Sequence, residues 1–225
     1  MYQDFYRDGV TEIKFESEQL NEVLKKIINK EVHDGFELKT KYSKTFDLRP
    51  DVISYHPVFM NALKENNIKD TLKKITLRDL SLFHVQVRLV KDEKSYMNWH
   101  RDTYYNQNGD LIGQAPHGVK IIYYPNFSNE DEDRLLYLKG SNRILFPNNA
   151  YDNQLFKILH VEKIKSRNNT AVLFDTNGLH AVVPEKPGKK SIRLIYNFLE
   201  KSQIDMLSKS PDDIHQQTSK LYDDL

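Results

Sequence analysis

The sequence predicts a mainly β protein, an antiparallel sandwich or barrel with helices in front of it and a short helical tail behind. Three observations predict this class. Apolar residues recur at helical spacing within about the first 79 positions. From about residue 80, short apolar segments alternate with Gly, Pro and Asn, and no long helical segment separates them. We therefore expect a single domain over residues 1–225, with a helical lead-in at about 1–79, a β core at about 80–200 and a tail at about 201–225.

The lead-in is predicted to be helical from the spacing of its apolar residues. Residues 17–31 carry Leu20, Leu24 and Ile28 one turn apart, and Ser17 is placed to cap the N-terminus of the helix. A second helical region is expected within residues 57–75. The polar tail from about 203 to 222 is also expected to be helical.

The β core is predicted to begin with the segment LSLFHVQVRLV at residues 80–90. Its residues alternate, so that Val85 and Val87 share one face while His84, Gln86 and Arg88 share the other. Further strand candidates follow, separated by turn-forming residues. They are GVKIIYYPNF, RLLYLKGS, NTAVLFDT, HAVV and SIRLIYNFLE.

Composition limits the chemistry that the chain can perform. It contains no cysteine, which excludes disulfides, cysteine-ligated zinc and thiol catalysis. Any transition metal must therefore be held by His and carboxylate groups. The net charge is +1 and the Lys and Arg residues are dispersed, so we expect no nucleic-acid partner.

Neither a membrane nor an export signal is indicated. No apolar segment approaches the roughly 18 residues that a membrane helix needs. The first 20 residues lack the basic-then-apolar layout of a secretory signal. We expect a cytoplasmic protein, and the sequence does not decide between a monomer and a dimer.

The segment NWHRDTYY suggests a metal site, because His100 and Asp102 stand one residue apart. With 8 His and 32 acidic residues in 225, about one such pair is expected by chance. In an extended segment, however, both side chains point the same way and can meet one ion. A second histidine, His180, follows a strand candidate in FDTNGLHAVVP. Two imidazoles and one carboxylate can occupy one face of an octahedral Fe(II) and leave three positions open.

A rival pair, His160 and Glu162, has the same spacing. It lies only 18 residues before His180, too close for the strands that should separate the two halves of such a site. The ordinary interpretation of either His-x-acid pair is a polar pair on a strand surface.

Arg193 is the candidate anchor for an organic acid bound to the metal. The turn EKPG at residues 185–188 reverses the chain and brings Arg193 back to about the height of His180, tightly for a hairpin and less tightly for a turn between two sheets. A guanidinium is a permanent, bidentate partner for a carboxylate. Ser191 shares its face and could add a hydroxyl donor. The alternative for Arg193 is an ion pair on an exposed strand.

In this order, WHRD, GLHAVVP and SIR resemble the Fe(II)/2-oxoglutarate-dependent oxygenases, most of all the phytanoyl-CoA dioxygenase-like branch. YLKGSNRILF at residues 137–146 resembles the Pro-Gly-Ser-His segment of that branch, with Lys139 and Asn142 as departures. The resemblance covers about residues 80–200 and implies a double-stranded β-helix (jelly-roll, cupin-like) core. It also implies three iron ligands and a group that binds the C5 carboxylate of 2-oxoglutarate. The implied ligands are His100, Asp102 and His180, and the implied carboxylate-binding group is Arg193.

Other residues are expected at the site if the polar face of residues 80–90 lines the cavity. Gln86 could then contact 2-oxoglutarate, and Arg88 could pair with an anionic substrate group, with His84 and Tyr104 nearby. If that face meets solvent, these strand residues have no role. Lys120 is an alternative anchor for 2-oxoglutarate, because some relatives use a lysine on the strand after the His-x-Asp. Its ordinary interpretation is a solvated lysine on a strand edge.

The resemblance implies Fe(II), 2-oxoglutarate and O2 as cofactors. Related halogenases have Gly or Ala in place of the carboxylate, so Asp102 favours hydroxylation, with desaturation or ring chemistry as alternatives. Leu199 stands where the DNA-repair branch has a second arginine. We expect hydroxylation of an unactivated C–H bond of a small polar metabolite, with succinate and CO2 as co-products. The competing hypotheses are a cupin-like metal enzyme that does not use 2-oxoglutarate and a non-catalytic jelly-roll binding module.

Overall fold

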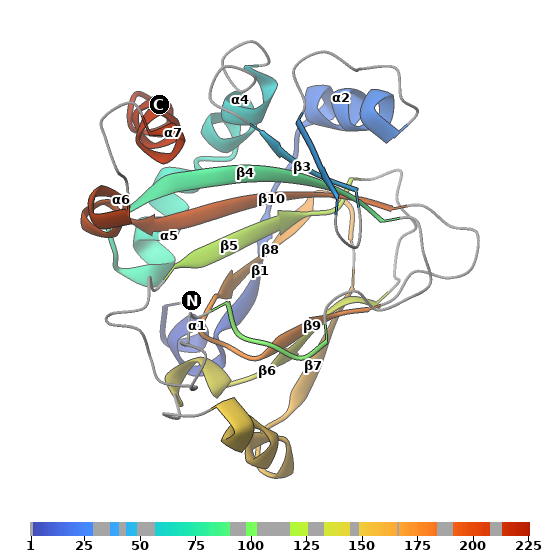
Figure 1. Cartoon of the computed structure of the whole chain (residues 1–225), viewed down its shortest axis with the longest axis vertical. Coiled ribbons are helices and arrows are strands. Elements are labelled where there is room, and N and C mark those ends of the chain that lie inside the picture. Colours follow the sequence, from blue (N-terminus) through green and yellow to red (C-terminus); the bar gives the residue numbers. More distant parts are fainter. Residues whose placement is uncertain are drawn as a thin grey trace.

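The computed structural model describes most of the chain, and two antiparallel sheets dominate it (Figure 1). The described residues are 2–28, 37–40, 44–48, 57–90, 98–102, 118–125, 133–144, 149–165, 167–183, 191–207 and 213–225. The larger sheet has the order β1 (Val10–Lys14), β8 (Thr170–Asp175), β5 (Val119–Tyr123), β10 (Ser191–Glu200), β4 (Leu80–Val90), β3 (Lys44–Leu48) and β2 (Glu37–Thr40). The smaller sheet has the order β7 (Val161–Lys165), β6 (Asp133–Leu138) and β9 (His180–Val182).

From residue 80 onwards the chain passes back and forth between the two sheets. After β4 in the larger sheet, residues 98–102 join the edge of the smaller sheet through a bridge between His100 and His180. Then β5 returns to the larger sheet, β6 and β7 lie in the smaller one, and β8, β9 and β10 alternate. This path is a double-stranded β-helix, and the predicted mainly β jelly-roll fold is confirmed.

The lead-in contributes strands as well as helices. Its helices are α1 (Tyr2–Asp8), α2 (Glu18–Ile28), α4 (Val58–Glu65) and α5 (Ile68–Thr76). Strands β1, β2 and β3 extend the larger sheet at both ends, which the sequence pattern did not predict because each is only four or five residues long. Helices α6 (Lys201–Leu207) and α7 (Ile214–Asp223) form the predicted tail, and two 3-10 helices, η1 (Ser141–Arg143) and η2 (Asn149–Lys157), follow β6.

The predicted helix starts and breaks have visible causes. Ser17 caps α2, since its Oγ accepts a hydrogen bond from the Leu20 amide at 3.4 Å. The helical region expected at 57–75 is two helices, because Asn67 takes a left-handed conformation with φ of 50° between them. The preceding Asn66 donates from its side chain to the Glu16 carbonyl at 2.9 Å and ties this break to the start of α2.

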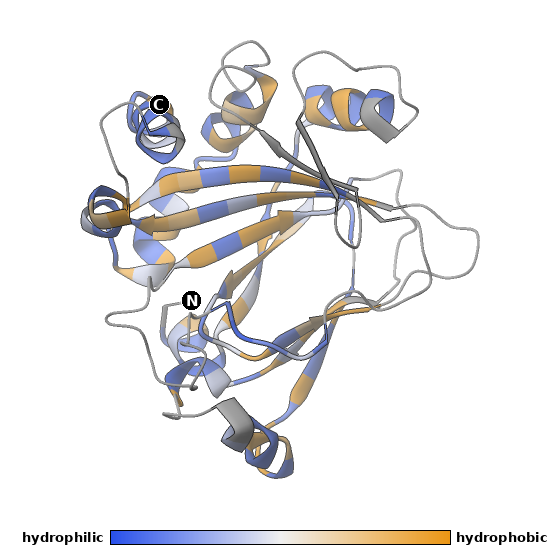
Figure 2. Cartoon of the chain, in the orientation of Figure 1, coloured by the Kyte–Doolittle hydropathy of each residue, from blue (hydrophilic) through white to orange (hydrophobic). Residues whose placement is uncertain are grey.

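Helices cover the outer face of the larger sheet, and its inner face looks toward the smaller sheet (Figure 1). Hydropathy alternates along β4, β10 and β5 (Figure 2). Val85 and Val87 belong to the core beneath the helices, whereas Ile122 and Ile195 belong to a second core between the sheets. Because side chains alternate along a strand, the polar face of β4 points into the space between the sheets rather than to solvent.

Among the described residues, no helix combines the length and apolar character needed to cross a membrane.

Candidate metal centre

The three residues proposed as metal ligands come together at the edge of the smaller sheet. His100 and Asp102 lie in the segment 98–102, and His180 is the first residue of β9. The backbones of His100 and His180 exchange two N–H to O hydrogen bonds of 3.0 Å each. The Asp102 amide donates to the Thr176 carbonyl at 3.0 Å. The two segments that carry the triad are therefore joined through their backbones on both sides of it.

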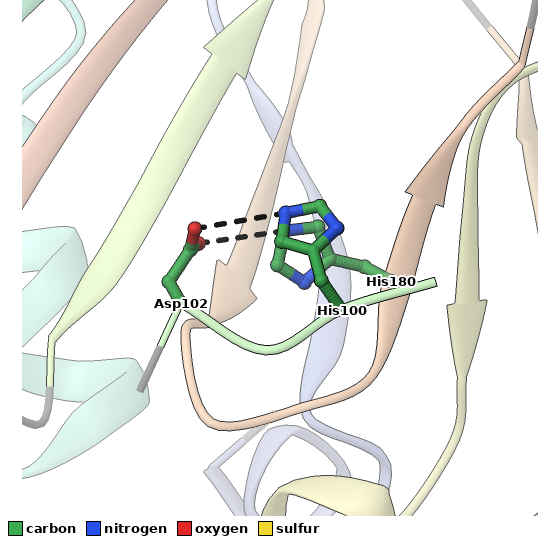
Figure 3. A group of neighbouring side chains, drawn as sticks. All are labelled: His100, Asp102 and His180. Atoms are coloured by element: carbon green, nitrogen blue, oxygen red, sulfur yellow. Dashed lines mark ion pairs between the residues drawn. The ribbon is translucent and has the colours of Figure 1, made fainter. Parts of the chain in front are cut away.

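The side chains of the triad converge on one point (Figure 3). One potential ligand atom from each residue lies within 4.8 Å of the other two. His180 Nε2 is 3.4 Å from Asp102 Oδ2, and His100 Nε2 is 3.8 Å from Asp102 Oδ1. The two imidazole rings are 4.3 Å apart between centroids. The spacing suits three ligands on one face of a single metal ion.

Hydrogen bonds set which nitrogen of each imidazole faces the centre. His100 Nδ1 lies 2.7 Å from the Asn98 carbonyl, and His180 Nδ1 lies 2.9 Å from the Gly178 carbonyl. A carbonyl only accepts, so each Nδ1 carries the proton and donates it. Each ring then turns its Nε2 toward Asp102, the arrangement typical of metal-binding histidines. Within the described residues, His100 Nε2 is buried and has no hydrogen-bond partner.

The protonation states at the centre also suit a cation. Burial lowers the pKa of His180 to about 4, although the Asp102 carboxylate opposes this shift. Burial acts to raise the pKa of Asp102, but Lys120 and the two histidines together hold it well below its ordinary value. The triad thus offers neutral His180 and an ionised carboxylate near neutral pH, which are the forms that bind metals.

Arg101, between His100 and Asp102 in the sequence, points away from the triad and forms a hub of hydrogen bonds. Its Nε donates to Asp152 Oδ2 at 3.0 Å, and its Nη2 donates to Asp152 Oδ1 at 2.9 Å and to the Ile144 carbonyl at 2.8 Å. Its Nη1 donates to the Ser141 carbonyl at 2.8 Å and to the Asn177 carbonyl. This buried guanidinium joins the His-x-Asp segment to η1, η2 and the loop that leads to His180. Sequence reasoning missed it, although alternation in an extended segment already sends residue 101 to the opposite side from its neighbours.

The segment that resembles Pro-Gly-Ser-His holds the loop that leads to His180 in place through hydrogen bonds. Ser141 Oγ donates to the Leu138 carbonyl at 2.6 Å and accepts from the Leu179 amide at 2.8 Å. In the same loop, Gly178 packs against the ring and hydroxyl of Tyr137, so closely that a Cβ would overlap them. Lys139, which departs from the Pro-Gly-Ser-His pattern, forms ion pairs instead. Its Nζ lies 3.4 Å from both Asp8 and Glu162.

The inner face of the larger sheet carries three rows of side chains across β4, β10 and β5, as the strand register shows. The first row consists of His84, Asn197 and Lys120; the second of Gln86, Ile195 and Ile122; the third of Arg88, Arg193 and Tyr124. The first row lies at the triad, because Lys120 Nζ is 2.9 Å from Asp102 Oδ2. The third row is four residues further along β10, about 13 Å away.

Arg193 is the most buried charged side chain near the site. It is 1% exposed and its guanidinium lies 5.7 Å from the ring centroid of Tyr124. It is therefore not an exposed ion pair. The hairpin interpretation of the turn before it is wrong, because β9 and β10 belong to different sheets. The chain therefore crosses between the sheets at this point, as in the alternative interpretation, and the turn itself, residues 185–188, lies outside the described residues.

The remaining predicted residues lie elsewhere or outside the described part. Ser191 pairs with Val90 at the start of β10, but its side chain is not among those described, and neither is Tyr104. The side chain of the rival His160, just before β7, is 76% exposed, and its Nε2 lies 3.9 Å from Glu162 Oε2 on β7. Arg88 and Gln86 contact each other at 3.3 Å on the inner face.

Comparison with known proteins supports the fold. No family model and no curated protein matches the chain. SnoN, the non-heme alpha ketoglutarate dependent epimerase from nogalamycin biosynthesis, is similar with a TM-score of 0.67 at 11% identity, over 88% of this chain and 81% of SnoN. EctD from S. alaskensis with bound Fe is similar with a TM-score of 0.67 at 14% identity, over 89% of this chain and 76% of EctD. HygX from Streptomyces hygroscopicus, solved with nickel, 2-oxoglutarate and hygromycin B, has a TM-score of 0.60 at 14% identity, over 88% of this chain and 85% of HygX.

At these identities the likeness concerns the fold. The chain shares the jelly-roll fold of iron- and 2-oxoglutarate-dependent enzymes, and the resemblance expected from the sequence is confirmed at that level. The likeness does not single out the phytanoyl-CoA dioxygenase-like branch.

Proposed function

We propose that this protein is a non-haem Fe(II)- and 2-oxoglutarate-dependent oxygenase that hydroxylates an unactivated C–H bond of a small polar molecule. One observation carries the proposal. The Nε2 atoms of two histidines, whose Nδ1 atoms donate to backbone carbonyls, converge with a carboxylate on one point between the sheets of a jelly roll. This donor set is the one that non-haem Fe(II) oxygenases use, and it leaves positions open for an oxo acid and O2.

The residues present fit an iron ion. His100, Asp102 and His180 would hold it, with two neutral nitrogens and one negative oxygen as donors. When bound, Fe(II) and 2-oxoglutarate would supply the oxidising chemistry that inserts one atom of O2 into a C–H bond and releases succinate and CO2. The hydrogen bonds from the Nδ1 atoms to Asn98 and Gly178 keep both rings in the orientation that binds metal.

Arg193 is the residue we assign to the far carboxylate of 2-oxoglutarate. Its guanidinium is buried on the inner face, in the row that lies furthest from the triad. An oxo acid held at the triad by one end would need a cation for its far carboxylate, and this row of the inner face carries one. Gln86 lies in the row between and could contact the same molecule, and Ser191 stands two residues before Arg193 on the same strand. Lys120 fits this role less well, because its ammonium lies at Asp102 itself.

Support for these cofactors also comes from proteins of similar fold. SnoN has been solved with Fe3+, alpha ketoglutarate and nogalamycin RO, and HygX with nickel, 2-oxoglutarate and hygromycin B. Because Asp102 occupies the third ligand position here, we propose hydroxylation rather than halogenation.

The proposal is tested without knowledge of the substrate. Metal-free protein is loaded anaerobically with Fe(II) and titrated with 2-oxoglutarate, while the visible metal-to-ligand charge-transfer band is recorded. We expect the band to develop and saturate. Asp102→Ala should weaken Fe(II) binding by more than the roughly 10–100-fold that loss of an outer-sphere partner costs, and should abolish the band.

His160→Ala is the matched control, since it breaks the exposed His-x-Glu pair on β7. It should leave both Fe(II) binding and the band unchanged. Iron binding without a band in the natural protein would favour a cupin-like enzyme that does not use 2-oxoglutarate. Absence of iron binding would favour a binding module.

A further inference from the structure

A pocket of about 180 Å³ lies beside Asp102, at the row of the larger sheet nearest the triad. Its polar wall includes the side chains of His84, Lys120 and Asn197, which come from three neighbouring strands. Its apolar wall includes Phe83, Val119 and Leu207. Because a metal ligand forms part of the lining, a molecule in this pocket would stand next to the reacting centre.

Lys120 brings a positive charge into this pocket. Its Nζ lies 2.9 Å from Asp102 Oδ2, and this is its one ion pair within the part of the chain that the structure describes. Its cross-strand neighbours on β10 and β8 are Asn197 and Phe174, which carry no charge. His84, 3.3 Å from Asn197, is neutral, since burial and then the nearby Lys120 lower its pKa to about 3. Asp102 is therefore the counter-charge that the described residues supply to Lys120.

A metal ion at the triad would bind the same Asp102 carboxylate. Asp102 would then share its negative charge with a divalent cation, and the Lys120 ammonium would lose part of its counter-charge. A partly buried charge is costly unless an opposite charge pairs with it. The side chain of Lys120 is only 18% exposed. The metal-loaded centre consequently calls for another anion at this position.

We propose that this pocket is a subsite for a carboxylate group of the primary substrate, with Lys120 as its counter-ion. This inference rests on the proposed function and specifies its substrate class as small carboxylic acids with a short apolar portion. His84 and Asn197 supply neutral hydrogen-bonding groups at the carboxylate, while the apolar portion packs against Phe83 and Leu207. Metal binding prepares the subsite, because it withdraws Asp102 from Lys120.

A carboxylate at Lys120 could also come from 2-oxoglutarate. The strand register argues for a separate molecule. Lys120 lies opposite Asn197, whereas Arg193 lies four residues further along β10, about 13 Å from that row. The test must nevertheless separate the two sources, and two anchors with different partners allow it to do so.

The experiment uses three variants of the full chain. Lys120→Met removes the charge and keeps the length of the side chain, and Lys120→Arg keeps the charge. Lys165→Met is the matched control, an exposed lysine on β7. The first measurement is calorimetric binding of Co(II) alone. Lys120→Met should bind Co(II) about tenfold more tightly than the natural protein, because the competing ammonium is gone.

The second measurement titrates butyrate, and its neutral isostere butyramide, into anaerobic protein loaded with Fe(II) and 2-oxoglutarate. We expect butyrate to bind at least about tenfold more tightly than butyramide, in the natural protein, in Lys120→Arg and in Lys165→Met. Lys120→Met should lose this preference while its affinity for 2-oxoglutarate stays within about threefold of the natural value.

Several outcomes overturn the proposal. Equal binding of butyrate and butyramide by the natural protein means that the site does not recognise the anion. An unchanged preference for butyrate in Lys120→Met means that the anion binds elsewhere, for example at the metal. A large loss of 2-oxoglutarate affinity in Lys120→Met assigns the lysine to the oxo acid instead. If the natural protein shows no charge-transfer band, the proposed function fails separately. The subsite is then decided by Co(II)-loaded protein, in which both the tighter metal binding of Lys120→Met and the preference for butyrate must persist.

Discussion

The edge of the smaller sheet and the inner face of the larger sheet build the site in different ways. At the edge, backbone hydrogen bonds join His100 to His180, and the Arg101 guanidinium ties the same segments to η1 and η2. On the inner face, rows of side chains from β4, β10 and β5 stand on regular strands, and their identities decide what they contact.

This difference implies that the edge sets the positions of the candidate ligands, whereas the inner face decides which small molecules bind. The positions of the candidate metal ligands depend on contacts that involve the backbone, so that changes at the edge should alter stability and metal binding together. The inner face can exchange a polar residue for another without altering the strands that carry it. Variants there should change the binding of small molecules and leave the free energy of unfolding nearly constant. Four variants test this separation.

Arg101→Met should have the largest effect on stability. It leaves the buried Asp152 carboxylate without its counter-charge and removes donors from three carbonyls, which should lower the free energy of unfolding by about 3–5 kcal/mol. Urea unfolding of the metal-free protein measures this loss, and Co(II) titration should show weaker binding in the same variant.

The double variant with Arg101→Met and Asp152→Leu serves as its control. With both charges removed, stability should recover in part. Metal binding should remain weak, since the loop that leads to His180 still lacks its hydrogen bond from residue 101. Full stability in Arg101→Met alone would show that the edge is held by its backbone without the hub.

Arg193→Met tests the opposite region. Loss of the bidentate guanidinium should weaken 2-oxoglutarate binding about 100-fold, which corresponds to about 2.7 kcal/mol. Fe(II) affinity should stay the same, because position 193 stands four residues, about 13 Å of strand, from the row at the triad. The charge-transfer titration gives the first quantity and calorimetry the second. An unchanged affinity for 2-oxoglutarate would remove Arg193 as the anchor and leave Lys120 as the next candidate.

Gly178→Ala disturbs the edge without touching any charge. An added Cβ would overlap the Tyr137 ring and hydroxyl, so that the loop before His180 must shift, at a cost of about 1–3 kcal/mol in the free energy of unfolding. The Gly178 carbonyl holds His180 Nδ1, and the shift should therefore also weaken Co(II) binding. Normal stability together with weakened metal binding would show that this loop moves independently of the sheet.

Local patterns predicted the mainly β class and the pairing of His100 with Asp102, whereas the jelly roll and the ligand set that includes His180 came from the resemblance to the oxygenases. Alternation along residues 80–90 predicted a strand, and the His-x-Asp spacing predicted two side chains on one side of an extended segment. The Arg101 hub could not be predicted, because Asp152 lies 51 residues away in the sequence. The rows of side chains on the inner face could not be predicted either, because the sequence does not show that β10 lies between β4 and β5 in the sheet.

His84→Gln should have the smallest effect. It tests whether water reaches the inner face beside the triad. Burial, with Lys120 and His215 acting in the same direction, lowers the pKa of His84 to about 3. The imidazole of an unfolded chain titrates near pH 6.5, at about the ordinary value. As the pH falls from 7 to 5, the unfolded chain gains a proton that folded His84 does not accept, and the folded state loses stability.

The loss attributable to His84 between pH 7 and 5 should be about 1–2 kcal/mol. His84→Gln should remove that part of the pH dependence in urea unfolding, while His160→Gln, at an exposed position, should leave it unchanged. Equal slopes in the natural protein and in His84→Gln would mean that folded His84 can take up a proton from water. The first row would then belong to the solvated mouth of the site, and a charged substrate group could reach Lys120 without giving up its own hydration.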